Sequence, residues 1–320
     1  MDLSLLQKRT AIIKQVRSFF DNKNYLELDT PLLSGDLIPE SCLEVFQTER
    51  IFPHGSKKEN RPLWLVPSPE IFMKKIIAQH NVNVYQICKC FRNGESCGHL
   101  HNSEFTMLEY YTMNADYMDS LALTEELFSH LSKDSAISAN KFERITVADA
   151  FAKWAGFDLF KAAKEGSAAM EEQARKLGLE PMSGMTVHQL YDLIFIHSVE
   201  PQIKTEKPIA LLDYPAFVPC LAKKSPNGQT VERWELYCNG IELANCYSEE
   251  NNPNAVKEFF TSEEAEKNKT AVVKHKVDND YWKMFEKFPR CSGTAIGLDR
   301  LIMALTGKAT IDSVLPFIEY

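Results

Sequence analysis

Apolar and polar positions recur along the chain with two different periods, and together they predict a mixture of helices and strands. Residues 3–22 place apolar side chains near helical spacing with basic residues between them, which predicts an amphipathic helix. The segment YLELDTP, residues 25–31, alternates and then stops at a proline, which is typical of a short or edge strand. The sequence PSPE is a helix-start signal, so a helix is predicted over 64–79.

The middle of the chain changes from strand patterns to helical ones. Residues 84–91 and 104–111 are aromatic and branched and enclose a polar stretch that contains glycine, which predicts two antiparallel strands with a long loop. Residues 115–200 then turn helical, and prolines 201 and 208 mark the exit. We interpret 115–200 as a mainly helical insertion within a single domain that spans residues 1–320.

The last third of the chain predicts a hairpin and then a strand that leads into a helix. Residues 233–238 and 241–247 are joined by Asn239-Gly240, the pair best suited to a two-residue type I′ turn. Further on, the strand pattern SGTAIG leads into LDRLIMAL, a helix that Gly307 closes.

The predicted turn fixes the register of the hairpin and puts Glu235 and Glu242 on one face. Two carboxylates there suit a magnesium ion on phosphate oxygens, because this ion takes few carboxylates; a solvated acidic face is the alternative. Simple alternation puts Asn245 and Glu249 on the opposite face. A pocket that includes all four residues therefore requires a bulge near residues 243–245.

Two arginines are candidates for a site that activates a carboxylic acid with ATP. Arg92 lies in FRNGE, just before HNSEFTMLE, and its planar cation can bridge carboxylate and phosphate oxygens. Taken alone, it would be a surface arginine at a strand end. Arg300, in GTAIGLDR, can lie flat on a purine with Phe105 on the other side. The alternative is an ion pair of Asp299 with Arg300, with glycines that serve packing.

Composition narrows the classes of function. In 320 residues, 44% apolar side chains are enough to bury a full core, and no apolar run reaches the roughly 20 residues of a membrane span. Eight cysteines without dense spacing, and a start without an apolar leader, favour a reduced cytoplasmic protein. The net charge of −8 argues against sequence-independent binding of nucleic acid, which needs a surplus of Lys and Arg.

A cluster of thiol and imidazole side chains offers a competing interpretation as a zinc site. Its members are Cys88, Cys90, Cys97, His99 and His101. No CxxC spacing exists, and Cys88 and Cys90 share one face of a strand, so small buried cysteines are the favoured interpretation.

Together these stretches resemble the motifs of class II aminoacyl-tRNA synthetases, most closely those of the lysyl branch. The matching segments, in order, are LELDTP, PSPE, FRN, HNSEFTMLEYY, ERWELYCNGIELANCYSE and GTAIGLDRLIM, and they span about residues 1–320. The resemblance implies an α+β class II synthetase catalytic fold, an antiparallel sheet flanked by helices. It also implies a homodimer that uses ATP and Mg²⁺ to activate a lysine-like amino acid.

The resemblance further implies roles for individual residues, the catalytic ones being Arg92, Glu242 and Arg300. The residues expected to contact the nucleotide are Arg92, Glu95, Asn102, Phe105, Glu235, Leu236, Gly297 and Arg300, with Glu235 and Glu242 holding magnesium. Those expected around the amino acid are Ser68, Glu70, Glu109, Tyr111, Glu242, Asn245, Glu249 and Ala295. A diamino acid fits such a pocket, because buried ammonium groups are tolerable only opposite carboxylates.

The chain also departs from the family pattern. Gly94 stands where many class II enzymes have an acid, Ser103 replaces a common proline, and the loop between them looks one residue longer than usual. Glu95 is therefore expected to be the weaker nucleotide contact.

Lysyl-tRNA synthetases carry an oligonucleotide-binding barrel before the catalytic domain, whereas here the catalytic pattern begins at residue 1. With the charge of −8 and the segment CSGTA, the chain is similar to truncated paralogues that ligate (R)-β-lysine to a lysine side chain of elongation factor P. The expected acceptor is then elongation factor P, without tRNA, a membrane or an anticodon-binding domain. The alternatives are an enzyme that acylates tRNA or another small acceptor, and a non-catalytic regulator that binds an amino acid.

Overall fold

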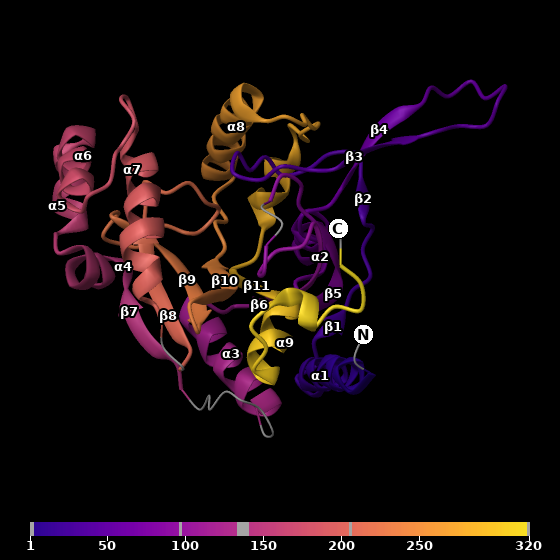
Figure 1. Ribbon diagram of the computed structural model, residues 1–320. Coiled ribbons are helices and arrows are strands. Elements are labelled where there is room, and N and C mark those ends of the chain that lie inside the picture. Colours follow the sequence, from indigo (N-terminus) through magenta and orange to yellow (C-terminus); the bar gives the residue numbers. More distant parts are fainter. Residues whose placement is uncertain (1–2, 96–97, 133–140, 205–206, 319–320) are drawn as a thin grey trace.

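Eight strands form the main sheet of the computed structural model, which describes residues 3–95, 98–132, 141–204 and 207–318 (Figure 1). Neighbours from β5 to β8 run antiparallel, while β1 and β7 pair parallel at the two edges. In order across the sheet, the strands are β1 (Leu26–Glu27), β5 (Val84–Phe91), β6 (Glu104–Met113), β11 (Cys291–Gly297), β10 (Ile241–Ser248), β9 (Thr230–Cys238), β8 (Ile209–Pro215) and β7 (Glu143–Thr146). The predicted α+β fold with an antiparallel sheet is confirmed.

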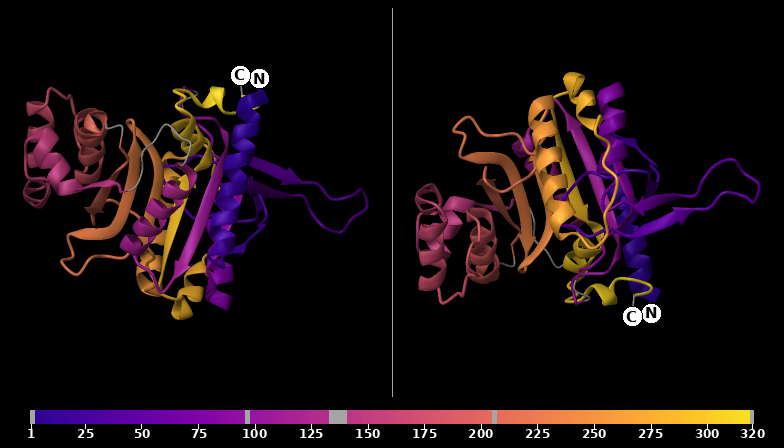
Figure 2. Two further views of the ribbon diagram at one scale, coloured as in Figure 1. Left: turned by 90° about the horizontal axis from the view of Figure 1, so that it is seen from below. Right: turned by 90° about the horizontal axis from the view of Figure 1, so that it is seen from above.

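One face of the sheet is covered by three helices (Figure 2, left). They are α1 (Leu3–Asn22), α3 (Tyr117–Leu131) and α9 (Leu298–Thr306). Phe20 of α1 stacks on Tyr85 of β5 with ring centroids 4.8 Å apart, and Trp234 of β9 is fully buried with its indole N–H donating to Tyr117 O. Side chains along each strand point alternately to the two faces of the sheet. The apolar side chains of one face form this core, and the remaining side chains point to the opposite face.

The opposite face carries two separate groups of helices. One group packs over β5, β6 and β11 and consists of α2 (Glu70–His80), α8 (Pro253–Thr270) and η5 (Tyr281–Lys287). The other packs over β8 and β9 and consists of α4 (Val147–Ala150), η2 (Phe151–Ala155), α5 (Leu159–Glu165), α6 (Ser167–Lys176), α7 (Val187–Ile194), η3 (Phe195–Val199) and η4 (Glu200–Gln202). The two groups stand apart in Figure 2, and the middle of the sheet lies between them.

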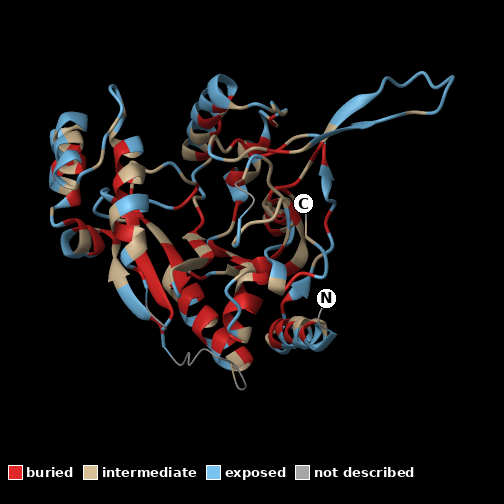
Figure 3. Cartoon of the chain, in the orientation of Figure 1, coloured by how far each residue is buried: buried red, intermediate tan, exposed pale blue. Residues whose placement is uncertain are grey.

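A second, smaller sheet projects from the body of the molecule as an arm (Figure 1). Its order is β2 (Leu33–Ser34), β4 (Arg61–Leu65) and β3 (Gln47–Arg50). The arm is largely exposed, whereas buried residues follow the main sheet and the helix faces turned toward it (Figure 3). A short helix, η6 (Ile311–Ser313), follows α9.

Most predicted elements are confirmed, and the structure differs from the prediction in three places. The helix expected over 64–79 begins only at Glu70, because Arg61–Leu65 pair with Gln47–Arg50 in the arm. In the segment 115–200, α3 belongs to the core under the main sheet, and Glu143–Thr146 form an edge strand. The long helix α8 had no counterpart in the sequence interpretation. No helix of the described residues is long and apolar enough to cross a membrane.

Candidate active site

Cross-strand pairing brings one residue from each of five strands into a row on the open face of the sheet, and four of the five are polar. Gln86 pairs with Glu109, Glu109 with Ala295, Ala295 with Asn245, and Asn245 with Glu235. Directly opposite residues on paired strands share a face, so these side chains lie side by side although they are far apart in the sequence.

The hairpin of β9 and β10 has the predicted turn. Asn239 and Gly240 have φ values of 52° and 77°, and a type I′ turn needs positive φ at both positions. Glu242 pairs with Tyr237, which places it on the same face as Glu235, as expected.

The predicted bulge is also present, at Leu243. The register shifts between Glu242 and Ala244, so that Ala244 pairs with Leu236 and Asn245 with Glu235. The extra residue moves every later side chain of β10 to the other face of the sheet, because side chains alternate with a period of two. Glu242 and Asn245 thereby face the same side.

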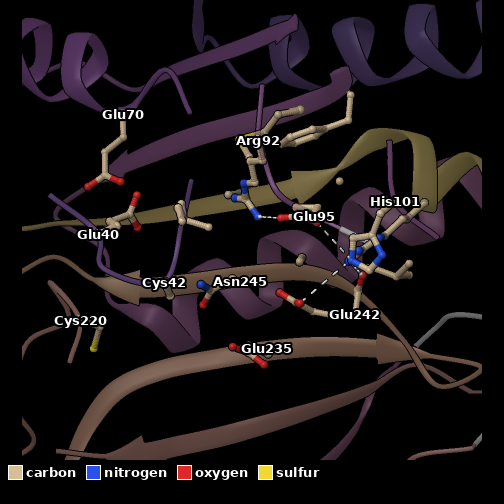
Figure 4. Close-up of a pocket in the computed structure, with 18 of the residues that line it drawn as sticks. Glu40, Cys42, Glu70, Arg92, Glu95, His101, Cys220, Glu235, Glu242 and Asn245 are labelled. Carbon is tan, nitrogen blue, oxygen red and sulfur yellow. Dashed lines mark hydrogen bonds and ion pairs between the residues drawn. The ribbon is translucent and has the colours of Figure 1, made fainter. Parts of the chain in front are cut away.

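A cavity of about 410 Å³ lies over this row (Figure 4). The predicted site residues that line it are Glu70, Arg92, Glu95, Asn102, Phe105, Glu235, Glu242, Asn245, Ala295, Gly297 and Arg300. The remaining predicted pocket residues, Ser68, Glu109, Tyr111 and Glu249, form a buried polar network that joins the cavity at Glu70. Leu236 sends its side chain into the opposite core, so only its backbone remains for the expected nucleotide contact.

Arg92 is held over an aromatic ring at one end of the cavity. Its guanidinium carbon lies 5.2 Å from the centroid of the Phe105 ring, an arrangement favoured by the negative face of the ring. Glu95 contacts both Arg92, at 4.0 Å, and His101 Nε2, at 3.5 Å. Phe105 therefore orients Arg92 as well as lining the cavity.

Arg300 faces the cavity because its neighbour Asp299 is engaged elsewhere. Asp299 is buried, pairs with Arg9 at 2.6 Å and accepts from Thr106 N at 2.7 Å. Arg300 donates to Glu242 O at 3.0 Å and lies 4.0 Å from the Glu242 carboxylate. The alternative of an Asp299–Arg300 ion pair is therefore wrong.

The two glutamates of the hairpin have different surroundings. Glu235 accepts from the hydroxyls of Tyr214, at 2.5 Å, and Tyr237, at 2.8 Å, and pairs with Arg233. Burial, together with the negative charge of Glu235, raises the pKa of Glu242 to about 7, against the opposing effect of Arg300. A divalent cation between them would offset that repulsion, so this donor set fits magnesium.

A lysine that the sequence interpretation overlooked sits among the carboxylates at the other end. Lys74 is fully buried, and its Nζ lies 2.5 Å from Glu70 and 2.6 Å from Glu249. Burial alone would lower the pKa of Lys74, but the two carboxylates overcome this and raise it well above its ordinary value. The i,i+4 spacing of Glu70 and Lys74 on a predicted helix was the available signal.

Glu109 forms the floor of this acidic end. It accepts hydrogen bonds of 2.7 Å from both Ser68 Oγ and Tyr111 Oη. Burial and the charge of Glu70 nevertheless raise the pKa of Glu109 to about 8, and burial raises that of Glu249 to about 7. The carboxyl groups of Glu109 and Glu249 can therefore each lose a proton when a cation binds beside them.

Gly293 permits this packing. A Cβ atom placed there would lie 2.5 Å from Tyr111 Cε1 and closer still to Glu249 Oε1. Only glycine lets both side chains converge over the strand, so this glycine serves the acidic end and not the nucleotide end.

Two cysteines of the zinc alternative lie on strand β5, as expected. Cys88 and Cys90 share a face, with their sulfur atoms 3.8 Å apart, and Cys90 is buried. Cys97 lies outside the described residues. Within the described part of the chain, no three His, Cys, Asp or Glu side chains are placed to hold a metal.

Comparison with known proteins agrees with this geometry. The family model for "tRNA synthetases class II (D, K and N)" matches residues 3–319. The chain is 33% identical to the elongation factor P--(R)-beta-lysine ligase of Vibrio atlanticus over 98% of its length and 94% of the relative's, and 31% identical to that of Avibacterium paragallinarum over 98% and 95%. The protein of the same name from Vibrio cholerae is 33% identical over 98% and 95%. The chain belongs to the class II tRNA synthetase family of the D, K and N enzymes.

Proposed function

We propose that this protein is an ATP-dependent ligase that activates (R)-β-lysine as an adenylate and transfers it to a lysine side chain of elongation factor P. The family uses ATP, and relatives that match nearly the whole chain bear the name of this activity. The observation that carries the proposal is one cavity lined by Arg92, Arg300 and Glu70, because Glu70 connects it to the buried carboxylates Glu109 and Glu249.

The charges at the acidic end match a diamino acid. Glu70, Glu109 and Glu249 supply three carboxylates, and Lys74 neutralises one of them. Two carboxylates therefore remain in excess, equal to the two ammonium groups of lysine or β-lysine. The buried Oδ1 of Asn245 has no hydrogen-bond partner among the described residues and offers one further acceptor to an ammonium.

Activation brings a carboxylate against a triphosphate, so its main demand is for positive charge. Arg92 binds the α-phosphate and the amino-acid carboxylate, and Arg300 stacks on adenine, whose other contacts are Asn102 and Phe105. Glu235 and Glu242 hold Mg²⁺, which supplies charge neutralisation on the phosphates when it is bound. Alignment and charge neutralisation then lower the barrier, and no side chain becomes covalently linked.

The acceptor is a protein and not tRNA. The net charge of −8 favours this, because a phosphate backbone is gripped by a surplus of Lys and Arg. The active unit is a homodimer in the cytoplasm, as in the family pattern.

Incubation with ATP, labelled β-lysine, elongation factor P and total tRNA tests the function. We expect the label on elongation factor P, in a bond that resists mild alkali as an amide does. Efficient charging of tRNA in the same mixture, with unlabelled elongation factor P, would overturn the proposal and favour a tRNA-acylating enzyme.

Ala295 is expected to set the choice between the two isomers of lysine. It lines the cavity and pairs with Glu109 and Asn245, so its methyl group limits the space beside the substrate's amino group. Ala295→Gly should raise the efficiency with α-lysine relative to β-lysine by about 10- to 200-fold, the usual range for one methyl group. The measurement is the ratio of kcat/KM for the two isomers; an unchanged ratio would make Ala295 ordinary strand packing.

A further inference from the structure

Glu40 differs from the other acidic side chains of the cavity. It lies in the loop between β2 and β3, and Figure 4 shows its carboxylate beside that of Glu70, with Arg92 and Asn245 across the cavity. The other acids that line the cavity each have a partner; they are Glu70, Glu95, Glu235, Glu242, Glu263 and Asp299. Among the described residues, the Glu40 carboxylate has neither a hydrogen bond nor an ion pair.

The loop that carries Glu40 is fixed in place. Ser41 N donates to Glu263 of α8 at 2.8 Å, and Lys267 of α8 donates to Glu40 O at 2.9 Å and to Leu43 O. Glu44 accepts from Val272 N at 2.9 Å. The Glu40 carboxylate has no partner but stands on a backbone that these hydrogen bonds hold in place. It is therefore a preorganised group and not a mobile surface acid.

The charged groups around Glu40 come from every neighbouring element. Burial and the charges of Glu70 on α2 and Glu263 on α8 raise the pKa of Glu40 to about 7, while Arg92 and Lys267 oppose them. Cys42 lies on the same loop, and burial together with the charge of Glu40 raises the pKa of its thiol to about 11. A carboxyl group that titrates near neutrality can both accept and release a proton at physiological pH.

The amino acid itself leaves Glu40 unused. Its two ammonium groups are matched by the excess charge of Glu70, Glu109 and Glu249, so a further carboxylate beside Glu70 (Figure 4) is surplus to binding. Apolar side chains of one packed cluster also line the cavity, namely Ile38, Leu221 and Phe259. Such a wall suits the four-carbon stem of an incoming lysine, which buries its methylene groups and carries its amine to the end.

We propose that Glu40 is the general base for the transfer step, taking a proton from the acceptor amine as it attacks the adenylate. The inference rests on the proposed function and adds to it a residue that acts after activation is complete.

The acceptor amine, having released one proton to solvent, attacks the adenylate carbonyl, so that a C–N bond forms and the carbonyl electron pair moves to oxygen. The nitrogen, now positively charged, gives a proton to the Glu40 carboxylate. The carbonyl re-forms, the bond from carbon to the phosphate oxygen breaks, and AMP leaves with that electron pair. Glu40 then loses its proton to solvent.

The variant Glu40→Gln separates the two steps. We expect amino-acid-dependent pyrophosphate exchange, and the KM for β-lysine in that assay, to match the wild type. Transfer of β-lysine to elongation factor P should fall by about 10²–10⁴-fold, the usual contribution of a general base. Hydroxylamine, which is neutral at pH 7 and needs no base, should still capture the adenylate at the wild-type rate.

Glu258→Gln is the matched control, because this acid of α8 is exposed and does not line the cavity, and both assays should be unaffected. Nα-acetyl-lysine amide, at high concentration, serves as a second acceptor in parallel. If the wild-type enzyme modifies only this small amine, elongation factor P is not the acceptor. The rates of wild type and Glu40→Gln with the small amine then still test the role of Glu40. Unchanged transfer by Glu40→Gln to both acceptors would overturn the proposal, as would a raised KM for β-lysine in exchange, which would make Glu40 a substrate-binding group.

Discussion

Replacement of Arg300 by alanine is expected to reduce amino-acid-dependent pyrophosphate exchange by about 10²–10³-fold, the usual loss when one preorganised charge donor is removed. Arg300 faces the cavity, bonds Glu242 O at 3.0 Å and lies against the Glu242 carboxylate. Glu242→Gln, which keeps the shape and removes the charge, should have a loss of the same order because it removes a metal ligand. Both variants should stay folded, since both side chains are partly exposed.

Arg175→Ala, at an exposed arginine of α6, is the control and should leave exchange unchanged. Circular dichroism and the unfolding midpoint would show whether the fold is kept. Near-normal exchange by both Arg300→Ala and Glu242→Gln would remove the active-site assignment, whatever their effect on later steps.

Lys74→Met is expected to destabilise the protein by about 3–5 kcal/mol, the usual effect of breaking a buried ion pair on one side only. The substitution retains the apolar stem but leaves Glu70 and Glu249 facing each other without a cation. The measurement is the free energy of unfolding in urea. Lys75→Met is the matched control: this neighbour is partly exposed, 3.8 Å from Asp278, and its loss should stay within about 0.5 kcal/mol.

The loss of stability caused by Lys74→Met should also depend on pH. Glu249 already has a folded-state pKa of about 7, above its ordinary value of 4.5, and removal of Lys74 raises it further. A raised folded-state pKa means that the folded protein binds more protons, so stability falls as pH rises between the two values. Lys74→Met should therefore be closest to wild type near pH 5 and furthest from it near pH 8. A loss that is the same at both values would mean that packing, and not charge, is at stake.

The sequence predicted local structure well wherever a short motif determines geometry. The Asn239-Gly240 turn fixes the register of its hairpin, and the need to gather Glu242 and Asn245 on one side predicted the bulge at Leu243. The strand and helix around Gly297 followed from a change in period. The roles of the nucleotide-binding and amino-acid-binding residues stay predictions.

The residues and elements that the sequence did not predict depend on tertiary contacts. Lys74 was hidden because its second partner, Glu249, is 175 positions away, and only folding brings the two together. Glu40 lies in a loop without periodicity, and its position depends on α8, an element that was not predicted. The strand at Arg61–Leu65 has a proline in its pattern and pairs only within the arm, which made the helix appear to start too early.

The bulge at Leu243 decides which face of β10 the later residues occupy. Before it, alternation points Glu242 to the cavity; after it, the alternation is inverted, so that Asn245 also points there. If all of these residues continued in a regular strand, Asn245 would turn into the apolar core under α3 and Ala244 would face the substrate. Loss of Leu243 itself would not have this effect, because Glu242, Ala244 and Asn245 would then alternate and keep Glu242 and Asn245 on one face. A related chain can therefore present the same side chains with one residue fewer and no bulge, so a one-residue gap at this point of an alignment keeps both flanking segments on their proper faces.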